Sequence, residues 1–263
     1  MWKFLGSEIM SEKPVVNLIL ILFKERDFQL LKECCIGIKN QSYPCFVTVV
    51  YDPLTTQPER DLVSEFKFDE YVESPKEMST FPALRHKWAY DRSDYLYIAF
   101  QQGDDQPYLC RIEEQVNAIL TSKKEIGICF GGFHYCLNKD LNICDPNYFR
   151  FAKQHMFNVG YPSFWLLDKH LLPILPTING FEAPNEWEWD LFMLIEILKK
   201  VSGLIIDQSL GIYNQHQLNS TNTHCSKESQ MKHLRNLCEF FPTQLHLLKS
   251  IYEIKTDGTR TDN

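Results

Sequence analysis

The chain lacks the residue spacings that mark the commonest zinc sites and redox motifs. Its nine cysteines include no CxxC pair, and its eight histidines include no HxH or HxxxH pair. The cysteines lie in apolar contexts such as Cys34-Cys35, which favours buried free thiols in a reducing compartment. No apolar run approaches the roughly 20 residues that span a bilayer, because the best candidate, Val15 to Phe23, has only strand length. We therefore expect no transmembrane segment.

The chain also has no excess of basic residues over acidic ones. Lysine and arginine number 27 against 34 acidic residues, a formal net charge of −7, which argues against a general nucleic-acid binder. No glycine-rich phosphate loop follows the first expected strand, since Phe23-Lys-Glu-Arg-Asp27 contains no glycine, and this disfavours a nucleotidyltransferase. With no secretory pattern at the N-terminus, we expect a cytoplasmic protein that could be peripheral to a membrane.

What the sequence does contain is an alternation of apolar strands and amphipathic helices. At 263 residues and 44% hydrophobic content, the chain can bury the core of an α/β domain. Consecutive strands joined by helices should be parallel, and strands this apolar need helices on both faces. We expect strands over residues 15–23, 46–51, 70–72, 95–100 and 126–133 and a strand pair near 204–206 and 211–213, with helices near 31–38, 83–90, 109–119 and 187–200.

Acidic residues gather where the expected elements end or begin. Asp52 follows the second strand, Asp104 and Asp105 follow the strand Tyr95 to Phe100, and Glu186-Trp-Glu188-Trp-Asp190 opens a late helix. Parallel strands bring their carboxyl ends to one edge, where paired carboxylates suit a divalent cation that bridges a diphosphate. Each cluster alone also fits a turn residue or a helix cap.

An ordered set of short motifs resembles glycosyltransferase family 2, whose members have the GT-A fold. The resemblance covers about residues 13–221 and implies a Rossmann-like, mostly parallel sheet flanked by helices. It further implies an inverting enzyme that moves a sugar from a nucleoside-diphosphate sugar, expected to be a UDP-sugar, to a hydroxyl of a glycan, lipid-linked or protein-linked acceptor. The motifs are Gln41-Ser-Tyr-Pro44, Val49-Val-Tyr-Asp52, Arg85, Tyr97-Ile-Ala-Phe-Gln-Gln-Gly-Asp-Asp105, Glu188-Trp-Asp-Leu191 and Tyr213-Asn-Gln-His216.

The resemblance also implies roles for individual residues. The implied nucleotide contacts are an aromatic residue after the first strand, an acid after the second, an arginine before the metal strand and the first of the paired aspartates. A divalent metal, Mn²⁺ or Mg²⁺, is implied as cofactor. The nucleotide-binding residues would be Phe23, Asp52, Arg85 and Asp104. The metal ligands would be Asp105, Asp104 and His216. The catalytic base would be Glu188, with Asp190 and Glu186 as alternatives.

Three positions depart from the family pattern. Gln102 stands where the first aspartate of the metal motif is usual, Pro53 replaces a second acid after Asp52, and Trp187-Glu188 replaces the common Glu-Asp. These departures motivate an alternative in which the chain is a catalytically degenerate module that binds a nucleotide sugar or a glycan.

The same pattern divides the chain into three parts. Residues 1–13 form a lead-in, 14–225 the glycosyltransferase domain, and 226–263 a helical extension with a polar tail. Within the domain, residues 14–135 would bind the nucleotide, and residues 136–225 would bind the acceptor. The stretch between about 137 and 185 is expected to be irregular. The amphipathic segment from about Leu234 to Ile251 would dock on the core, on a partner or on a second copy in a homodimer.

Overall fold

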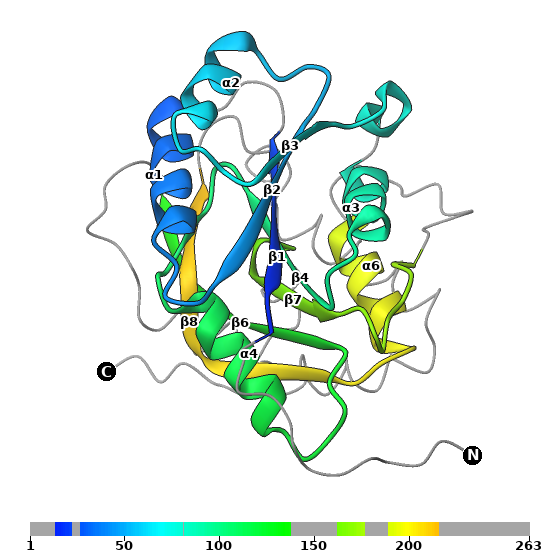
Figure 1. The fold of residues 1–263 in the computed structure, drawn as a ribbon. Coiled ribbons are helices and arrows are strands. Elements are labelled where there is room, and N and C mark those ends of the chain that lie inside the picture. Colours follow the sequence, from blue (N-terminus) through cyan, green and yellow to red (C-terminus); the bar gives the residue numbers. More distant parts are fainter. Residues whose placement is uncertain (1–13, 23–26, 81, 138–161, 177–188, 216–263) are drawn as a thin grey trace, which may run out of the picture.

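A computed structural model describes residues 14–22, 27–80, 82–137, 162–176 and 189–215 of the chain (Figure 1). Strands and helices alternate through the first half, as their apolar periodicity predicts. The strands are β1 (Val16–Leu22), β2 (Cys45–Tyr51), β3 (Glu70–Glu73), β4 (Tyr97–Gln102), β5 (Gln106–Pro107), β6 (Ile128–Leu137), β7 (Trp165–Asp168) and β8 (Gly203–Gln215). The helices are α1 (Phe28–Lys39), α2 (Gln57–Ser64), α3 (Pro82–Arg92), α4 (Arg111–Thr121) and α6 (Trp189–Leu198), with short 3-10 turns η1 (Lys76–Thr80) and η3 (Pro162–Phe164).

One sheet of eight strands runs through the described part of the chain in the order β3-β2-β1-β4-β7-β6-β8-β5. Its first four strands are parallel, and β6 and β8 are also parallel, whereas β7 and β5 run antiparallel to their neighbours. The order reverses after β1, because the chain builds outward to β3 and then returns to place β4 on the other side of β1. Such a reversal is where open α/β sheets bind their ligands.

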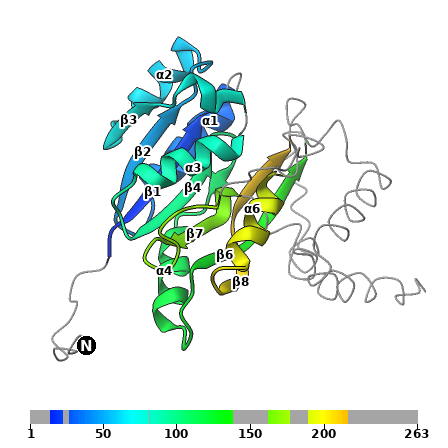
Figure 2. The same ribbon diagram turned by 90° about the vertical axis from the view of Figure 1, so that its right-hand side faces the viewer.

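Helices cover both faces of the sheet, as expected for strands that are apolar throughout (Figures 1 and 2). All seven residues of β1 are buried. Leu18, Leu20 and Leu22 pack toward α1, α2 and α4, whereas Ile19 and Ile21 pack toward α3 and α6. The alternation along β1 therefore separates two apolar cores, and the sheet that carries the site is supported from both sides.

The fold differs from the expectations at β5, which was not expected, and at β7, β8 and α2. The expected strand pair at 204–206 and 211–213 is wrong, because both segments belong to the single strand β8. Strand β7 lies in the region that we expected to be irregular, and helix α2 was not expected. The sequence of α2 is mostly polar, and the helix begins after Thr56, whose backbone N–H donates to the Glu59 carboxylate at 2.7 Å.

A bulge explains why β8 looked like two strands. Its register against β6 jumps from Gly131 opposite Ile206 to Gly132 opposite Ser209, so the polar residues between them form a bulge and not a turn. A Cβ atom on Gly131 would lie 2.7 Å from the Leu210 side chain, so the close approach of the strands requires glycine. Beyond the bulge, β8 pairs with β5 at Gly211 and Ile212.

Within the described residues, no helix combines the length and the apolar character that crossing a bilayer would demand. The lead-in over 1–13 and the amphipathic segment around 234–251 lie outside the described residues.

Candidate functional site

The sheet brings the predicted acidic residues to a single edge. Strand β1 lies between β2 and β4, with Leu22 opposite Tyr51 on one side and Ile21 opposite Gln102 on the other. Asp52 and Asp104 therefore follow strands that end at the same level, about 10 Å apart across two strand spacings. This arrangement confirms that the carboxyl ends of the second strand and of the Tyr95 to Phe100 strand share one edge.

Asp52 and Arg85, two predicted nucleotide-binding residues, form a buried ion pair. The Arg85 Nη2 atom lies 2.7 Å from Asp52 Oδ2, and both side chains are at most 4% exposed. Asp52 Oδ1 also accepts a hydrogen bond of 2.7 Å from the Leu54 backbone N–H, so the residue shapes the turn after β2 as well. Charges this buried are costly to separate, and the pair therefore fixes α3 against the end of β2.

Asp104 and Asp105 lie in the tight turn between β4 and β5, and both are buried. The Asp105 N–H donates to the Gln102 carbonyl at 3.2 Å. Its carboxylate accepts from the Ser163 hydroxyl at 2.6 Å and from the Asn214 N–H at 3.3 Å. The Asn214 side-chain amide donates to the Asp104 carbonyl at 2.8 Å, so the turn is held from η3 on one side and from β8 on the other.

A buried arginine at the start of helix α4 supports the same turn. Arg111 is fully buried at the start of α4, and burial lowers the pKa of its guanidinium to about 9. It donates to the side chains of Gln101 at 2.7 Å and Gln115 at 3.2 Å and to the carbonyls of Phe100 and Trp165. Gln101 in turn donates to the Asp105 carbonyl at 2.9 Å, which links Arg111 to the backbone of the acidic turn.

Close backbone approaches keep β5 in place beside the turn. A Cβ atom on Gly211 of β8 would lie 2.5 Å from the Gln106 carbonyl, and one on Gly37 of α1 would lie 2.8 Å from the Pro107 carbonyl. The Cys34 thiol donates to the Gln102 carbonyl at 3.3 Å. Burial, followed by Cys35 and the Asp105 and Asp104 carboxylates, raises the pKa of Cys34, so this thiol stays protonated at neutral pH.

Of the predicted site residues, the structure places five. Asp52 and Arg85 form one pair, Asp104 and Asp105 adjoin each other, and Asp190 lies in the first turn of α6. Phe23, Glu188 and His216 lie outside the described residues, as does the alternative base Glu186. Sequence reasoning did not identify the partners of the acidic turn as functional. Asn214 and Gln101 belong to quoted motifs, whereas nothing in the local sequence singles out Ser163 or Arg111.

The paired aspartates suit a hard divalent cation. Carboxylate oxygens are the ligands that Mg²⁺ and Mn²⁺ prefer, and such ions commonly use one or two carboxylates with the remaining positions left for phosphate and water. Among the described residues, no group of three or more histidine, cysteine, aspartate or glutamate side chains forms a closed metal cage. Asp104 and Asp105 supply two such carboxylates in one buried turn.

Comparison with known sequences gives no assignment: no protein-family model and no curated protein sequence matches the chain.

Solved structures match the chain in fold. TarS of S. aureus, residues 1–349 in complex with UDP, matches with a TM-score of 0.57 at 13% identity, over 84% of this chain and 63% of that one. The mannosyltransferase PcManGT from Pyrobaculum calidifontis, in complex with GDP-Man and Mn²⁺, matches with a TM-score of 0.57 at 14% identity, over 81% of this chain and 61% of that one. M. tuberculosis glucosyl-3-phosphoglycerate synthase matches with a TM-score of 0.52 at 12% identity, over 82% of this chain and 77% of that one. The chain spans less than two thirds of the first two structures, and at these identities the likeness establishes the fold.

Proposed function

From the premise that the chain has the GT-A fold of nucleotide-sugar glycosyltransferases, we propose that it is an inverting glycosyltransferase of the family 2 type. Its donor would be a nucleoside-diphosphate sugar, with UDP-sugars the first choice. Its acceptor would be a hydroxyl group on a glycan, whether free, lipid-linked or protein-linked. Fold alone does not determine function, so the proposal depends on the residues at the edge of the sheet.

The observation that carries the proposal is the position of Asp104 and Asp105 beside the Asp52–Arg85 pair. All four are buried at the edge where the strand order reverses, and two of them share a tight turn held by Ser163 and Asn214. A turn that served only to connect two strands would not need two adjacent buried carboxylates. We assign Asp52, Arg85 and Asp104 to the nucleotide, together with Phe23.

Asp105, with Asp104, would hold a Mn²⁺ or Mg²⁺ ion, and we propose His216 as a further ligand. Asn214, two residues before His216, contacts both aspartates, which supports the approach of this segment to the site. When bound, the ion would neutralise the charge that grows on the leaving diphosphate. Ser163 and Gln101 would keep Asp105 oriented, and the burial of the turn would limit the access of water.

The acceptor hydroxyl needs a base, since it is a poor nucleophile. Glu188 is our first assignment, and Asp190, in the first turn of α6, is the alternative. The carboxylate would take the hydroxyl proton while the oxygen attacks the anomeric carbon opposite the diphosphate. This attack inverts the anomeric centre, because the new bond forms on the face away from the leaving group.

Nucleotide release tests the proposal. The purified chain would be incubated with a panel of UDP- and GDP-sugars in the presence of Mn²⁺ or Mg²⁺. We expect release from at least one donor, with a loss of about a hundredfold or more in Asp105→Asn and Glu188→Gln. The matched control is Asp94→Asn, because Asp94 is exposed and precedes β4 at the opposite edge of the sheet. Donor binding without any turnover would contradict the proposal that the chain is an enzyme and would favour the degenerate binding module.

A further inference from the structure

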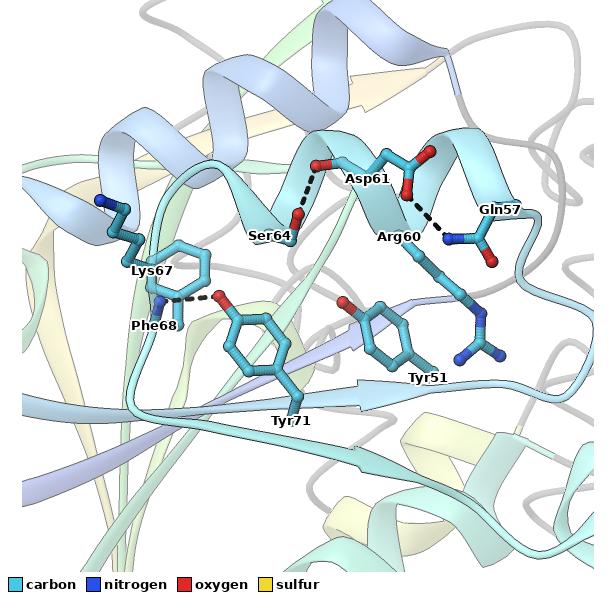
Figure 3. A pocket seen from close by; sticks show the side chains of 8 residues that line it. All are labelled: Tyr51, Gln57, Arg60, Asp61, Ser64, Lys67, Phe68 and Tyr71. Atoms are coloured by element: carbon cyan, nitrogen blue, oxygen red, sulfur yellow. Dashed lines mark hydrogen bonds between the residues drawn. The ribbon is translucent and has the colours of Figure 1, made fainter.

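A cavity lies between helix α2 and the outer strands β2 and β3, on the far side of the turn that carries Asp52 (Figure 3). Its volume is about 450 Å³. Tyr51 of β2 and Tyr71 of β3 form its floor, with ring centroids 6.1 Å apart and planes inclined by only 19°. The two residues are diagonal neighbours on one face of the sheet, because Tyr71 pairs with Val49. Since β3 is the edge strand, the Tyr71 ring is 37% exposed.

The face of α2 above these rings is polar. Gln57, Arg60, Asp61 and Ser64 follow helical spacing, and Figure 3 shows them above the two tyrosines. Gln57, Asp61 and Ser64 are exposed and Arg60 is partly exposed, so this side of α2 borders both the cavity and the solvent. Here the apolar packing of α2 is left to Val63 with its neighbour Leu62. The cavity therefore combines an aromatic floor with a wall of hydrogen-bonding groups.

The charges around the cavity balance one another. The Arg60 guanidinium lies 4.5 Å from the Tyr51 ring centroid, and its Nη2 atom is 3.2 Å from Glu73 Oε1. Gln57 donates to the Asp61 carboxylate at 2.7 Å, which fixes both side chains. A phosphate site would need unbalanced positive charge, whereas the two cations of the cavity, Arg60 and Lys67, are matched in number by the carboxylates of Asp61 and Glu73. The arrangement favours a neutral ligand that has many hydroxyl groups.

The Tyr51 hydroxyl adds a donor on the floor of the cavity. Tyr51 is only 8% exposed, and in Figure 3 its hydroxyl points toward α2. Burial raises the pKa of Tyr51 to about 12, so the group remains a neutral O–H donor at physiological pH. In contrast, the Tyr71 oxygen accepts from the Phe68 N–H at 2.8 Å, which holds that ring in place.

We propose that this cavity is an accessory binding site for a neutral sugar unit. A pyranose has an apolar face of C–H groups that packs against aromatic rings, and a rim of hydroxyls that pairs with amide, carboxylate and guanidinium groups. Tyr71, the exposed member of the pair, would carry the apolar face, because Arg60 already covers the Tyr51 ring, and Gln57, Asp61 and Arg60 would bind the rim. Arg60 also donates to the Asp52 carbonyl at 3.4 Å, so the cavity adjoins the other side of the Asp52 turn. That the sugar belongs to the acceptor glycan rests on the proposed function; the binding itself does not.

Ligand-observed NMR on the full chain tests the site. The probes would be neutral disaccharides and trisaccharides of glucose, N-acetylglucosamine, galactose and mannose. We expect at least one to bind in the millimolar range, and Tyr71→Ala to weaken it about tenfold or more. The matched control is Tyr95→Ala, because Tyr95 is also a partly exposed tyrosine in a stacked ring pair, with Phe46, at the other end of the sheet.

Two further variants keep the test decisive. Asp61→Asn retains the fold of the floor and should also weaken binding, even if Tyr71→Ala proves unstable. Asp105→Asn should leave sugar binding unchanged, which separates this site from the acidic edge and from the outcome of the turnover assay. The proposal is overturned if no probe binds, if Tyr71→Ala and Asp61→Asn bind as tightly as the wild type, or if Asp105→Asn alone abolishes binding.

Discussion

At the scale of single residues, the site depends on how Asp105 is oriented. Its carboxylate receives hydrogen bonds from Ser163, 58 positions later in the chain, and from Asn214, 109 positions later. Asp104 and Asp105 were predictable because an apolar strand stops abruptly at them. Ser163 was not, because its role depends on a contact that no local pattern encodes. Charged residues at strand ends are thus readable from sequence, whereas the partners that orient them come from the fold.

Removal of the Ser163 hydroxyl tests this orientation. Ser163→Ala takes away the donor to Asp105 and the acceptor of the Gln102 N–H at 3.2 Å, both within the protein interior. We expect a loss of about 1–3 kcal/mol in the free energy of unfolding, measured with urea. Donor turnover should fall about tenfold or more, because Asp105 loses a fixed geometry.

The control for Ser163→Ala is the same substitution at the surface. Ser42 also donates to a carboxylate, that of Glu113, at 2.7 Å, but it is exposed. Ser42→Ala should change stability by no more than about 0.5 kcal/mol and leave turnover unchanged. Equal effects of the two substitutions would contradict a special role for Ser163.

At the scale of elements, the strands that pair in sequence order were predicted best. Strands β1, β2, β3 and β4 lie within a few residues of their expected bounds, because each is a short apolar run joined to a helix. Strand β8 was divided wrongly, since the polar residues between its halves resemble a turn and the bulge opposite Gly131 is a property of its pairing with β6. Helix α2 was missed because its sequence is mostly polar, with Leu62 and Val63 as its only aliphatic residues, so it has no apolar periodicity.

Gly211, beyond the bulge of β8, tests whether β5 positions the acidic turn. Gly211→Ala would place a Cβ atom 2.5 Å from the Gln106 carbonyl and 2.6 Å from the Phe164 ring, and backbone cannot move aside cheaply. We expect a loss of about 1–3 kcal/mol in unfolding free energy, together with a loss of turnover as β5 and the acidic turn shift.

Gly203→Ala, on the same strand, is the control for Gly211→Ala. Its Cβ atom would meet the end of the flexible Leu198 side chain at 2.7 Å, and this side chain can rotate away. Gly203→Ala should therefore have a higher melting temperature and a higher turnover than Gly211→Ala. A Gly211→Ala protein with wild-type activity would show that β5 does not position the aspartates.

At the scale of the whole molecule, two apolar cores on either side of the sheet bury several thiols. Burial raises the pKa of Cys35 and of Cys129 from 9.0 to about 12. The unfolded chain loses these protons near pH 9 and the folded chain near pH 12, so the folded state binds more protons in this interval. Stability is then fully present below about pH 9 and declines above it, by about 1.4 kcal/mol per pH unit for each thiol.

Arg111 opposes this decline without reversing it. Its lowered pKa of about 9 means that the folded state loses a proton first, which adds stability as the pH rises. One arginine offsets one thiol, whereas burial raises the pKa of Cys34 and Cys45 as well. We expect the melting temperature to fall steeply between about pH 9 and about pH 10.5, and to fall less steeply in Cys35→Ala/Cys129→Ala. An unchanged slope in that variant would show that these thiols do not set the alkaline limit.

The account as a whole depends on a metal and a diphosphate meeting at Asp104 and Asp105. A crystal structure of the chain with UDP and Mn²⁺, recorded at a wavelength where manganese scatters anomalously, tests this claim most directly. We predict one anomalous peak within coordination distance, about 2.0–2.3 Å, of an Asp105 carboxylate oxygen, with the diphosphate on the same ion and the base near the Asp52–Arg85 pair. UDP bound elsewhere, or bound at this edge with no manganese beside Asp105, would contradict it.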